Sequence, residues 1–160
     1  MVRMDATDRQ ILTHLQRKGR ISINDLAERV NLTSAPTSRR VRELERSGAI
    51  RGYRADVDPA ALGLGFEALV HVTMNLEDTA TLAEFERALA QIPEMRHAER
   101  LFGDPDYLLR VVARDIEDFA DLRDQRIAAL PGVGQVTSTI VMRTIVDNQP
   151  LPTPRERRRR

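Results

Sequence analysis

The 160-residue chain contains no cysteine and no tryptophan, and only four phenylalanines and two tyrosines. Without cysteine it has no disulfide, no thiolate zinc site and no cysteine nucleophile. So few aromatic rings offer little for unpaired bases to stack on, which argues against a single-strand nucleic-acid binder. No apolar run approaches the roughly 18 residues of a membrane helix, and the N-terminus lacks an apolar signal core. These absences favour a soluble protein of the cytoplasm.

Recognisable catalytic patterns are also missing. The three histidines, His14, His71 and His97, have no metal-ligand spacing to one another. There is no Gly-rich phosphate loop and no nucleophile elbow. Asp104 and Asp106 could be imagined as a carboxylate pair, but acidic residues in turns are far commoner than catalytic pairs. We therefore expect no enzymatic activity, no metal and no cofactor.

The net charge of +1 conceals three segments of different sign. Residues 1–58 carry 12 Lys/Arg against 8 Asp/Glu, residues 59–150 carry 8 against 15, and residues 151–160 carry 5 against 1. A basic head and tail around an acidic body are expected when part of a chain meets a polyanion, although chance segregation of solvated charge is the alternative. We expect the tail to be disordered and either to attract phosphates or to have no function.

Three helical patterns follow one another in the first fifty residues. Asp5, Ser22 and Thr33 are each placed to cap a helix. The third helix has Pro36 in its first turn, where a missing N–H costs nothing, and stops before Gly48. Two short helices joined by a short turn are the helix-turn-helix geometry, which places the second helix in a DNA major groove.

The third helix separates apolar from basic residues. At about 100° per residue, Thr37, Val41 and Leu44 point inward, and an arginine stripe covers the opposite side. Guanidinium groups there can reach base edges near the helix N-terminus and phosphates further along; an exposed helix kept soluble by arginine is the alternative. Arg40 lies on a flank, where we expect a salt bridge or a phosphate contact. The predicted DNA-binding residues are Ser34, Ala35, Ser38, Arg39, Arg40, Arg42 and Arg46.

The rest of the chain alternates strand and helix patterns twice. The strand-like segments are 67–76, 95–102, 107–113 and 133–146, and the helix-like segments are 79–92 and 115–130, in which Ile116 is among the apolar positions. This β-α-β-β-α-β order predicts a ferredoxin-like α+β domain with helices on one face of an open sheet. The other face needs a partner, so we expect a homodimer.

The run LTSAPTSRRVRELERSGAIRGYRADVDPAALG, which starts at Leu32, resembles the leucine-responsive regulator/asparagine regulator (Lrp/AsnC) family. The later segments FGDPDYLLRV and LPGV match the same family, so the resemblance covers almost the whole chain. It implies a winged helix-turn-helix over residues 1–58, with a strand at 50–57. It further implies a ferredoxin-like effector-binding domain at 59–150, which leaves the tail at 151–160.

The resemblance also implies a function. The expected protein is a sequence-specific transcription regulator that binds double-stranded DNA at the nucleoid, responds to a free amino acid and assembles from dimers into a form such as an octamer. A DNA-bridging or compacting protein without an effector is the alternative. The resemblance assigns effector binding to the loop GDPDY, residues 103–107. A carboxylate there can pair with an α-ammonium, and a tight turn of turn-forming residues is the alternative. The effector-binding candidates are Gly103, Asp104, Asp106 and Tyr107, with Ser138 and Thr139 on the last strand.

Overall fold

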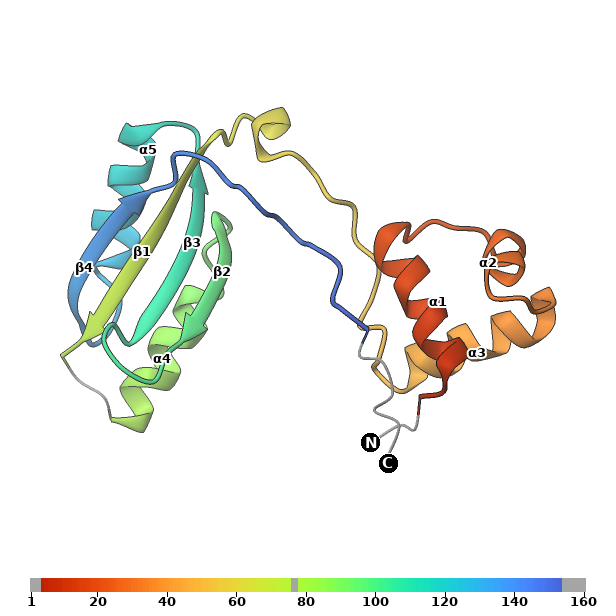
Figure 1. Cartoon of the computed structure of the whole chain (residues 1–160). Helices are drawn as coiled ribbons and strands as arrows, with labels where there is room; N and C mark the ends of the chain where they lie inside the picture. Colours follow the sequence, from red (N-terminus) through yellow and green to blue (C-terminus); the bar gives the residue numbers. More distant parts are fainter. Residues whose placement is uncertain (1–3, 76–77, 154–160) are drawn as a thin grey trace, which may run out of the picture. The chain divides into compact units, whose positions relative to one another are not determined.

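The computed structural model describes residues 4–75 and 78–153 and divides into two compact units (Figure 1). Of the described residues, one unit contains 4–56 together with 146–153, and the other contains 57–75 and 78–145. In the described part of the chain, no helix has both the length and the apolar composition that a bilayer crossing requires.

The first unit is built from three helices: α1 (Ala6–Arg17), α2 (Ile23–Arg29) and α3 (Ser34–Arg46). The Asp5 carboxylate caps α1 by accepting from the Asp8 backbone N–H at 2.8 Å, and the Asp8 side chain accepts from the Asp5 N–H in return. Ser22 caps α2 through the Asp25 N–H. Thr33 occupies the N-cap position of α3 as expected, but its side chain makes no capping hydrogen bond.

A small apolar cluster holds the three helices together. The three residues of α3 that were predicted to point inward, Thr37, Val41 and Leu44, are all buried. The Thr37 hydroxyl donates to the Thr33 carbonyl at 2.9 Å, so this buried polar group is satisfied. The cluster consists of Ile11, Leu26, Val30, Val41 and Leu44.

The strand expected at residues 50–57 does not form. A strand needs a neighbour that completes its backbone hydrogen bonds, and the described residues of this unit contain no other strand. One side-chain hydrogen bond connects the segment to α3: the Tyr53 hydroxyl donates to Glu45 at 3.0 Å. The returning C-terminal segment contacts α1, where the Gln16 amide accepts from the Leu151 N–H at 2.7 Å and donates to the Leu151 carbonyl at 3.4 Å.

The second unit confirms the predicted β-α-β-β-α-β order. Its four-stranded antiparallel sheet has the order β2-β3-β1-β4. After a short 3-10 helix at Pro59–Leu62, the elements are β1 (Phe66–Met74), α4 (Thr79–Leu89), β2 (Met95–Arg100), β3 (Tyr107–Ala113), α5 (Ile116–Asp121), the π-helical segment η2 (Leu122–Ile127) and β4 (Val133–Ile140).

Both helices pack on the same face of the sheet. Val70 and Val72 of β1 are fully buried there against Phe85 of α4 and Phe119 of α5. The alternate residues of β1 point to the open face, where Glu67 forms an ion pair with Arg110 of β3. The strand alternation thus divides the sheet into an apolar, helix-covered face and a mixed open face.

Two boundaries differ from the sequence prediction. The last strand ends at Ile140 rather than at residue 146. Ile140 pairs with Ala68, only two residues from the start of β1, so β1 offers almost no further residues for a longer strand to pair with. The helix expected over 115–130 is a short α-helix that continues as a π-helix. Ile116, one of the apolar positions of the expected helix, is 58% exposed because it opens the first turn of α5.

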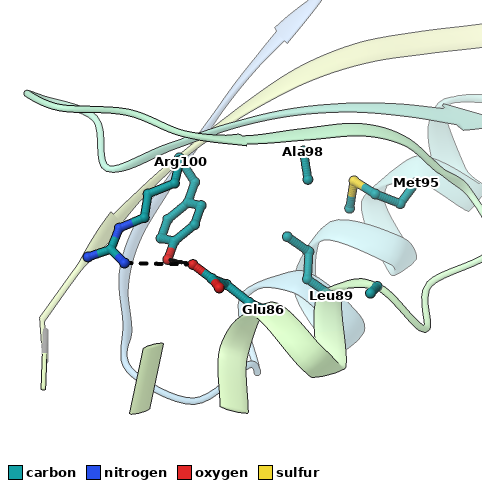
Figure 2. A pocket seen from close by; sticks show the side chains of 7 residues that line it. Glu86, Leu89, Met95, Ala98 and Arg100 are labelled. Atoms are coloured by element: carbon teal, nitrogen blue, oxygen red, sulfur yellow. Dashed lines mark hydrogen bonds and ion pairs between the residues drawn. The ribbon is translucent and has the colours of Figure 1, made fainter. Parts of the chain in front are cut away.

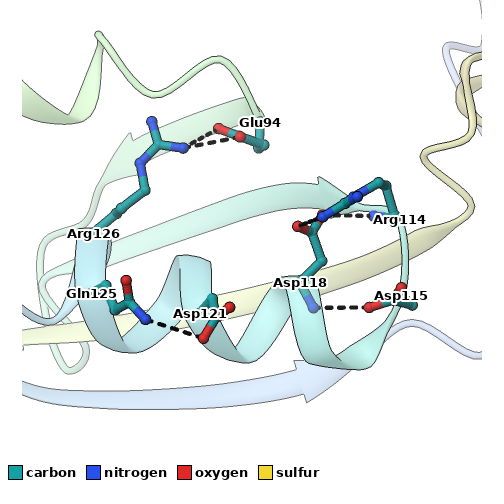
Figure 3. A network of polar contacts seen from close by, with 7 residues as sticks. All are labelled: Glu94, Arg114, Asp115, Asp118, Asp121, Gln125 and Arg126. Atoms are coloured by element: carbon teal, nitrogen blue, oxygen red, sulfur yellow. Dashed lines mark hydrogen bonds and ion pairs between the residues drawn. The ribbon is translucent and has the colours of Figure 1, made fainter.

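Polar contacts fix the start of α5 (Figure 3). Asp115 caps the helix by accepting from the Asp118 N–H at 2.8 Å. The Asp118 carboxylate in turn accepts from the guanidinium of Arg114 at 2.7 Å and from its backbone N–H at 3.0 Å. These bonds lower the pKa of Asp118 to about 2, the guanidinium contributing most.

Candidate DNA interface and effector site

The basic stripe predicted on α3 lies on the exposed side of the helix, opposite Val41 and Leu44. Arg39 has no hydrogen bond or ion pair within the described residues, so its guanidinium is available to a ligand. Arg42 donates to the Ser38 hydroxyl at 2.9 Å, which orients it along the helix. Arg46 forms a two-oxygen contact with Glu43 at 2.7 and 2.8 Å, and both side chains remain largely exposed.

Arg40 differs from these three arginines. Its guanidinium contacts Asp5 at 2.7 Å and Asp8 at 2.8 Å, both from the capping box of α1. The salt bridge expected for this flank position is therefore present. The hydrogen bond to Asp8, followed by that to Asp5, raises the pKa of Arg40, and the pKa of Asp5 is lowered, chiefly by the Asp8 backbone N–H. Arg40 thus joins α3 to α1.

The remaining predicted DNA-binding residues lie near the start of α3. Ser34 is exposed, and its hydroxyl donates to the Asn24 side-chain oxygen of α2 at 2.6 Å. This bond connects the two helices of the helix-turn-helix at the N-terminus of the second one. Ala35 is exposed beside it, whereas Ser38 is partly buried. The N-terminus of α3 therefore presents small side chains, which allow its backbone to approach a base edge closely.

The predicted effector loop connects β2 to β3. Gly103 has a φ of 141°, a conformation that strongly favours glycine. Asp104 is exposed, and its carboxylate has one long contact, from the Thr73 hydroxyl at 3.5 Å. The peptide bond between Asp104 and Pro105 is cis. Asp104 is thus the carboxylate of this loop with most capacity left for a further partner.

Asp106 is committed to the fold of the loop. Its carboxylate accepts from the Met74 N–H at the end of β1 at 2.7 Å. Its backbone N–H donates to the Val72 carbonyl at 3.0 Å, and its carbonyl accepts from the Leu101 N–H at 2.7 Å. Three bonds therefore hold Asp106 between two strands, and its side chain has less capacity for a ligand than that of Asp104.

The other candidates point elsewhere. Tyr107 is 2% exposed on the helix-covered face, where its hydroxyl donates to Glu86 at 2.8 Å; burial and then this bond raise its pKa to about 12. Ser138 and Thr139 lie on β4, which β1 separates from β3. Because they are successive strand residues, they point to opposite faces of the sheet. Within one chain, the structure therefore brings only Gly103, Asp104 and Asp106 together.

Sequence reasoning missed a second arrangement around Tyr107. The Tyr107 hydroxyl donates to Glu86 of α4, and 3.8 Å separates the Arg100 guanidinium of β2 from the Glu86 carboxylate (Figure 2). Both residues stand in ordinary helix and strand patterns with no local motif. The pairing of Arg100 with Tyr107 across β2 and β3 brings them together, and only the strand register shows it.

Comparison with known proteins agrees with this division of the chain. Residues 4–51 match a family model described as winged helix-turn-helix DNA-binding, and residues 67–151 match one described as Lrp/AsnC ligand binding domain. Together these models cover most of the chain and place the two predicted functions on separate units.

Similar proteins extend over the same length. The chain is 38% identical to the leucine-responsive regulatory protein of Rhizobium meliloti, over 91% of this chain and 94% of the relative. It is 36% identical to the proline dehydrogenase transcriptional activator of Rhodobacter capsulatus, over 90% and 94%. A Neisseria meningitidis transcriptional regulator, solved as an L-Met complex, shares 31% identity with a TM-score of 0.89, over 94% and 97% of the two chains. The chain therefore belongs to the Lrp/AsnC family of DNA-binding transcription regulators and contains that family's ligand-binding domain.

Proposed function

We propose that this protein is a sequence-specific regulator whose assembly or DNA affinity responds to a free amino acid. The observation that carries the proposal is the exposed arginine stripe of α3 in a chain whose other unit is a ligand-binding domain. Arg39 and Arg42 read base edges in the major groove, and Arg46 contacts phosphate further along the helix. The protein acts at the nucleoid in the cytoplasm.

Assembly is part of the proposal. The open face of the sheet carries Leu69 and Leu108 around the Glu67–Arg110 ion pair, and a second copy would cover these side chains. Phe102, at the tip of the β2–β3 loop, is fully exposed. An aromatic ring in that position supports further association of dimers, up to a form such as an octamer.

The effector site is proposed at the same loop. The Neisseria relative was solved with L-Met, which supports an amino acid as the effector class. The exposed Asp104 carboxylate would receive the ammonium group, and the backbone at Gly103 allows close approach. Ser138 and Thr139 would take part only if a second copy brings β4 to the loop.

Footprinting on the DNA upstream of the gene, combined with a thermal-shift screen of the twenty amino acids, tests this function. A regulator protects discrete sites, and an effector that binds the folded state raises the melting temperature and changes the footprint. An architectural DNA-compacting protein would instead show weak specificity, steep salt dependence and no amino acid response. That second result would contradict the proposal.

A further inference from the structure

Helix α4 leaves a groove beside β2, the edge strand of the sheet (Figure 2). Two alanines line it, Ala90 at the C-cap of α4 and Ala98 in β2, and both are exposed. Because these side chains are small, a cavity with a volume of about 260 Å³ remains. Pockets for drug-sized ligands begin at about 300 Å³, so this one suits a smaller molecule.

One end of the groove is charged with both signs. Glu86 and Arg100 stand 3.8 Å apart there, which is too far for a hydrogen bond. The Tyr107 hydroxyl donates a hydrogen bond to Oε1 of Glu86, while Oε2 has no hydrogen-bond partner within the described residues. Within the same described part of the chain, the Arg100 guanidinium makes no hydrogen bond either. An anion and a cation, both with unused bonding capacity, therefore face the same opening.

The other end of the groove is apolar. Leu89, 3% exposed, forms part of its wall, and Met95 lines it from the start of β2. A methionine side chain is flexible and polarisable, so it adapts to apolar groups of different shape. The side chains at this end offer an ion no polar partner, which disfavours ligands that are charged along their whole length.

We propose that this groove binds a free α-amino acid with an apolar side chain. Arg100 pairs with the ligand carboxylate, Glu86 accepts from the ammonium, and the side chain lies against Leu89 and Met95. This site is separate from the Gly103–Asp106 loop. It rests on the proposed function only in taking a free amino acid as the effector. A ligand that binds Glu86 competes with the hydrogen bond from the Tyr107 hydroxyl. Because Tyr107 directly follows Asp106, this competition changes the contacts of the residue next to the loop.

The test uses the full-length protein labelled with ¹³C-methyl methionine, because two of its five methionines report on the two sites. Met95 lines the groove, and Met74 donates its N–H to Asp106 of the loop. Met95→Leu and Met74→Leu assign the resonances. L-Leucine should shift the Met95 methyl saturably. Isocaproate, which lacks the ammonium, and isopentylamine, which lacks the carboxylate, should bind at least about tenfold more weakly.

Variants locate the site independently. Arg100→Gln and Glu86→Gln should each weaken leucine binding by about tenfold or more, and the amide oxygen introduced by Glu86→Gln can still accept from the Tyr107 hydroxyl. Ala90→Leu fills the groove and should abolish binding, whereas Ala83→Leu, at an exposed position of α4, should not. Circular dichroism and thermal melting check that each variant folds.

Two results would overturn the groove site. One is a saturable leucine response that shifts Met74 but not Met95 and survives Ala90→Leu, which would place the effector at the loop and leave the proposed function intact. The other is the absence of any saturable Met95 shift with all twenty amino acids. A wild-type protein that binds leucine in the groove but protects no DNA site would instead contradict the proposed function alone.

Discussion

Arg40 of the helix α3 and Asp8 of α1 form an ion pair with 2.8 Å between the guanidinium and the carboxylate, and Asp8 is only 15% exposed. Asp5 completes the arrangement at 2.7 Å. The four arginines of α3 therefore divide into one that joins two helices and three on the exposed side. Substitution of Arg40 should therefore lower stability, whereas substitution of an exposed arginine should lower DNA affinity.

Arg40→Met should lower the free energy of unfolding by about 1 kcal/mol, because it leaves the partly buried Asp8 without its cation. Chemical denaturation of the full chain measures this loss. At a protein concentration and temperature where both proteins are folded, specific DNA affinity should change less than in Arg39→Ala. An Arg40 variant of wild-type stability that has lost DNA binding would assign Arg40 to the DNA contact instead.

Arg39→Ala and Arg42→Ala should each weaken specific DNA binding by about 1–3 kcal/mol while stability is unchanged, since both side chains are exposed. Footprint titrations give the affinities. Arg87→Ala, which removes the same charge from an exposed position of α4, is the matched control. If both α3 variants protect DNA as the wild type does, the recognition-helix assignment is wrong.

Leu69→Lys should convert the proposed dimer to monomers, because it adds a cation to the open sheet face beside Arg110, its partner in the β1–β3 register. Light scattering at micromolar concentration reads the mass, and Leu69→Met serves as the control. A wild-type chain that is itself monomeric under these conditions would remove the premise of paired DNA half-sites.

Asp104→Ala should abolish the amino acid response of the loop and leave unliganded DNA binding near that of the wild type, because its side chain makes one long contact in the fold. Asp106→Ala should instead lower the melting temperature, because it leaves the Met74 N–H without its acceptor. Thermal melts with and without a confirmed effector separate the two. A full response in Asp104→Ala places the sensing site elsewhere, and the groove beside α4 is then the alternative.

The Asp118 carboxylate should make stability depend on pH. Its pKa is lowered from 3.8 to about 2 by Arg114, so its contribution is fully present above the unfolded value and is lost as the pH falls toward 2. The difference in unfolding free energy between wild type and Asp118→Asn should therefore be constant above about pH 5 and shrink between about pH 4 and 2. A difference that does not change over this range would show that the Arg114 contact is absent in solution.

Local patterns were enough for much of this molecule. The caps at Asp5 and Ser22 and the inward residues of α3 depend on spacings of three or four residues, which the helix itself imposes. The order of elements in the second unit follows from hydrophobic periodicity in the same way. The sequence by itself thus determined the helix-turn-helix and the α+β sheet.

Contacts between distant residues were decided only by the tertiary structure. The strand that the family resemblance implied at 50–57 has no neighbour to pair with in the described residues of its unit, and β4 stops where β1 begins. Asp106 is held in the fold and Asp104 is left nearly free because of their contacts with the end of β1, some thirty residues earlier. Glu86 and Arg100 meet because strand register places Arg100 beside Tyr107. Periodicity determines which face a residue occupies, whereas packing alone determines which residue it meets there.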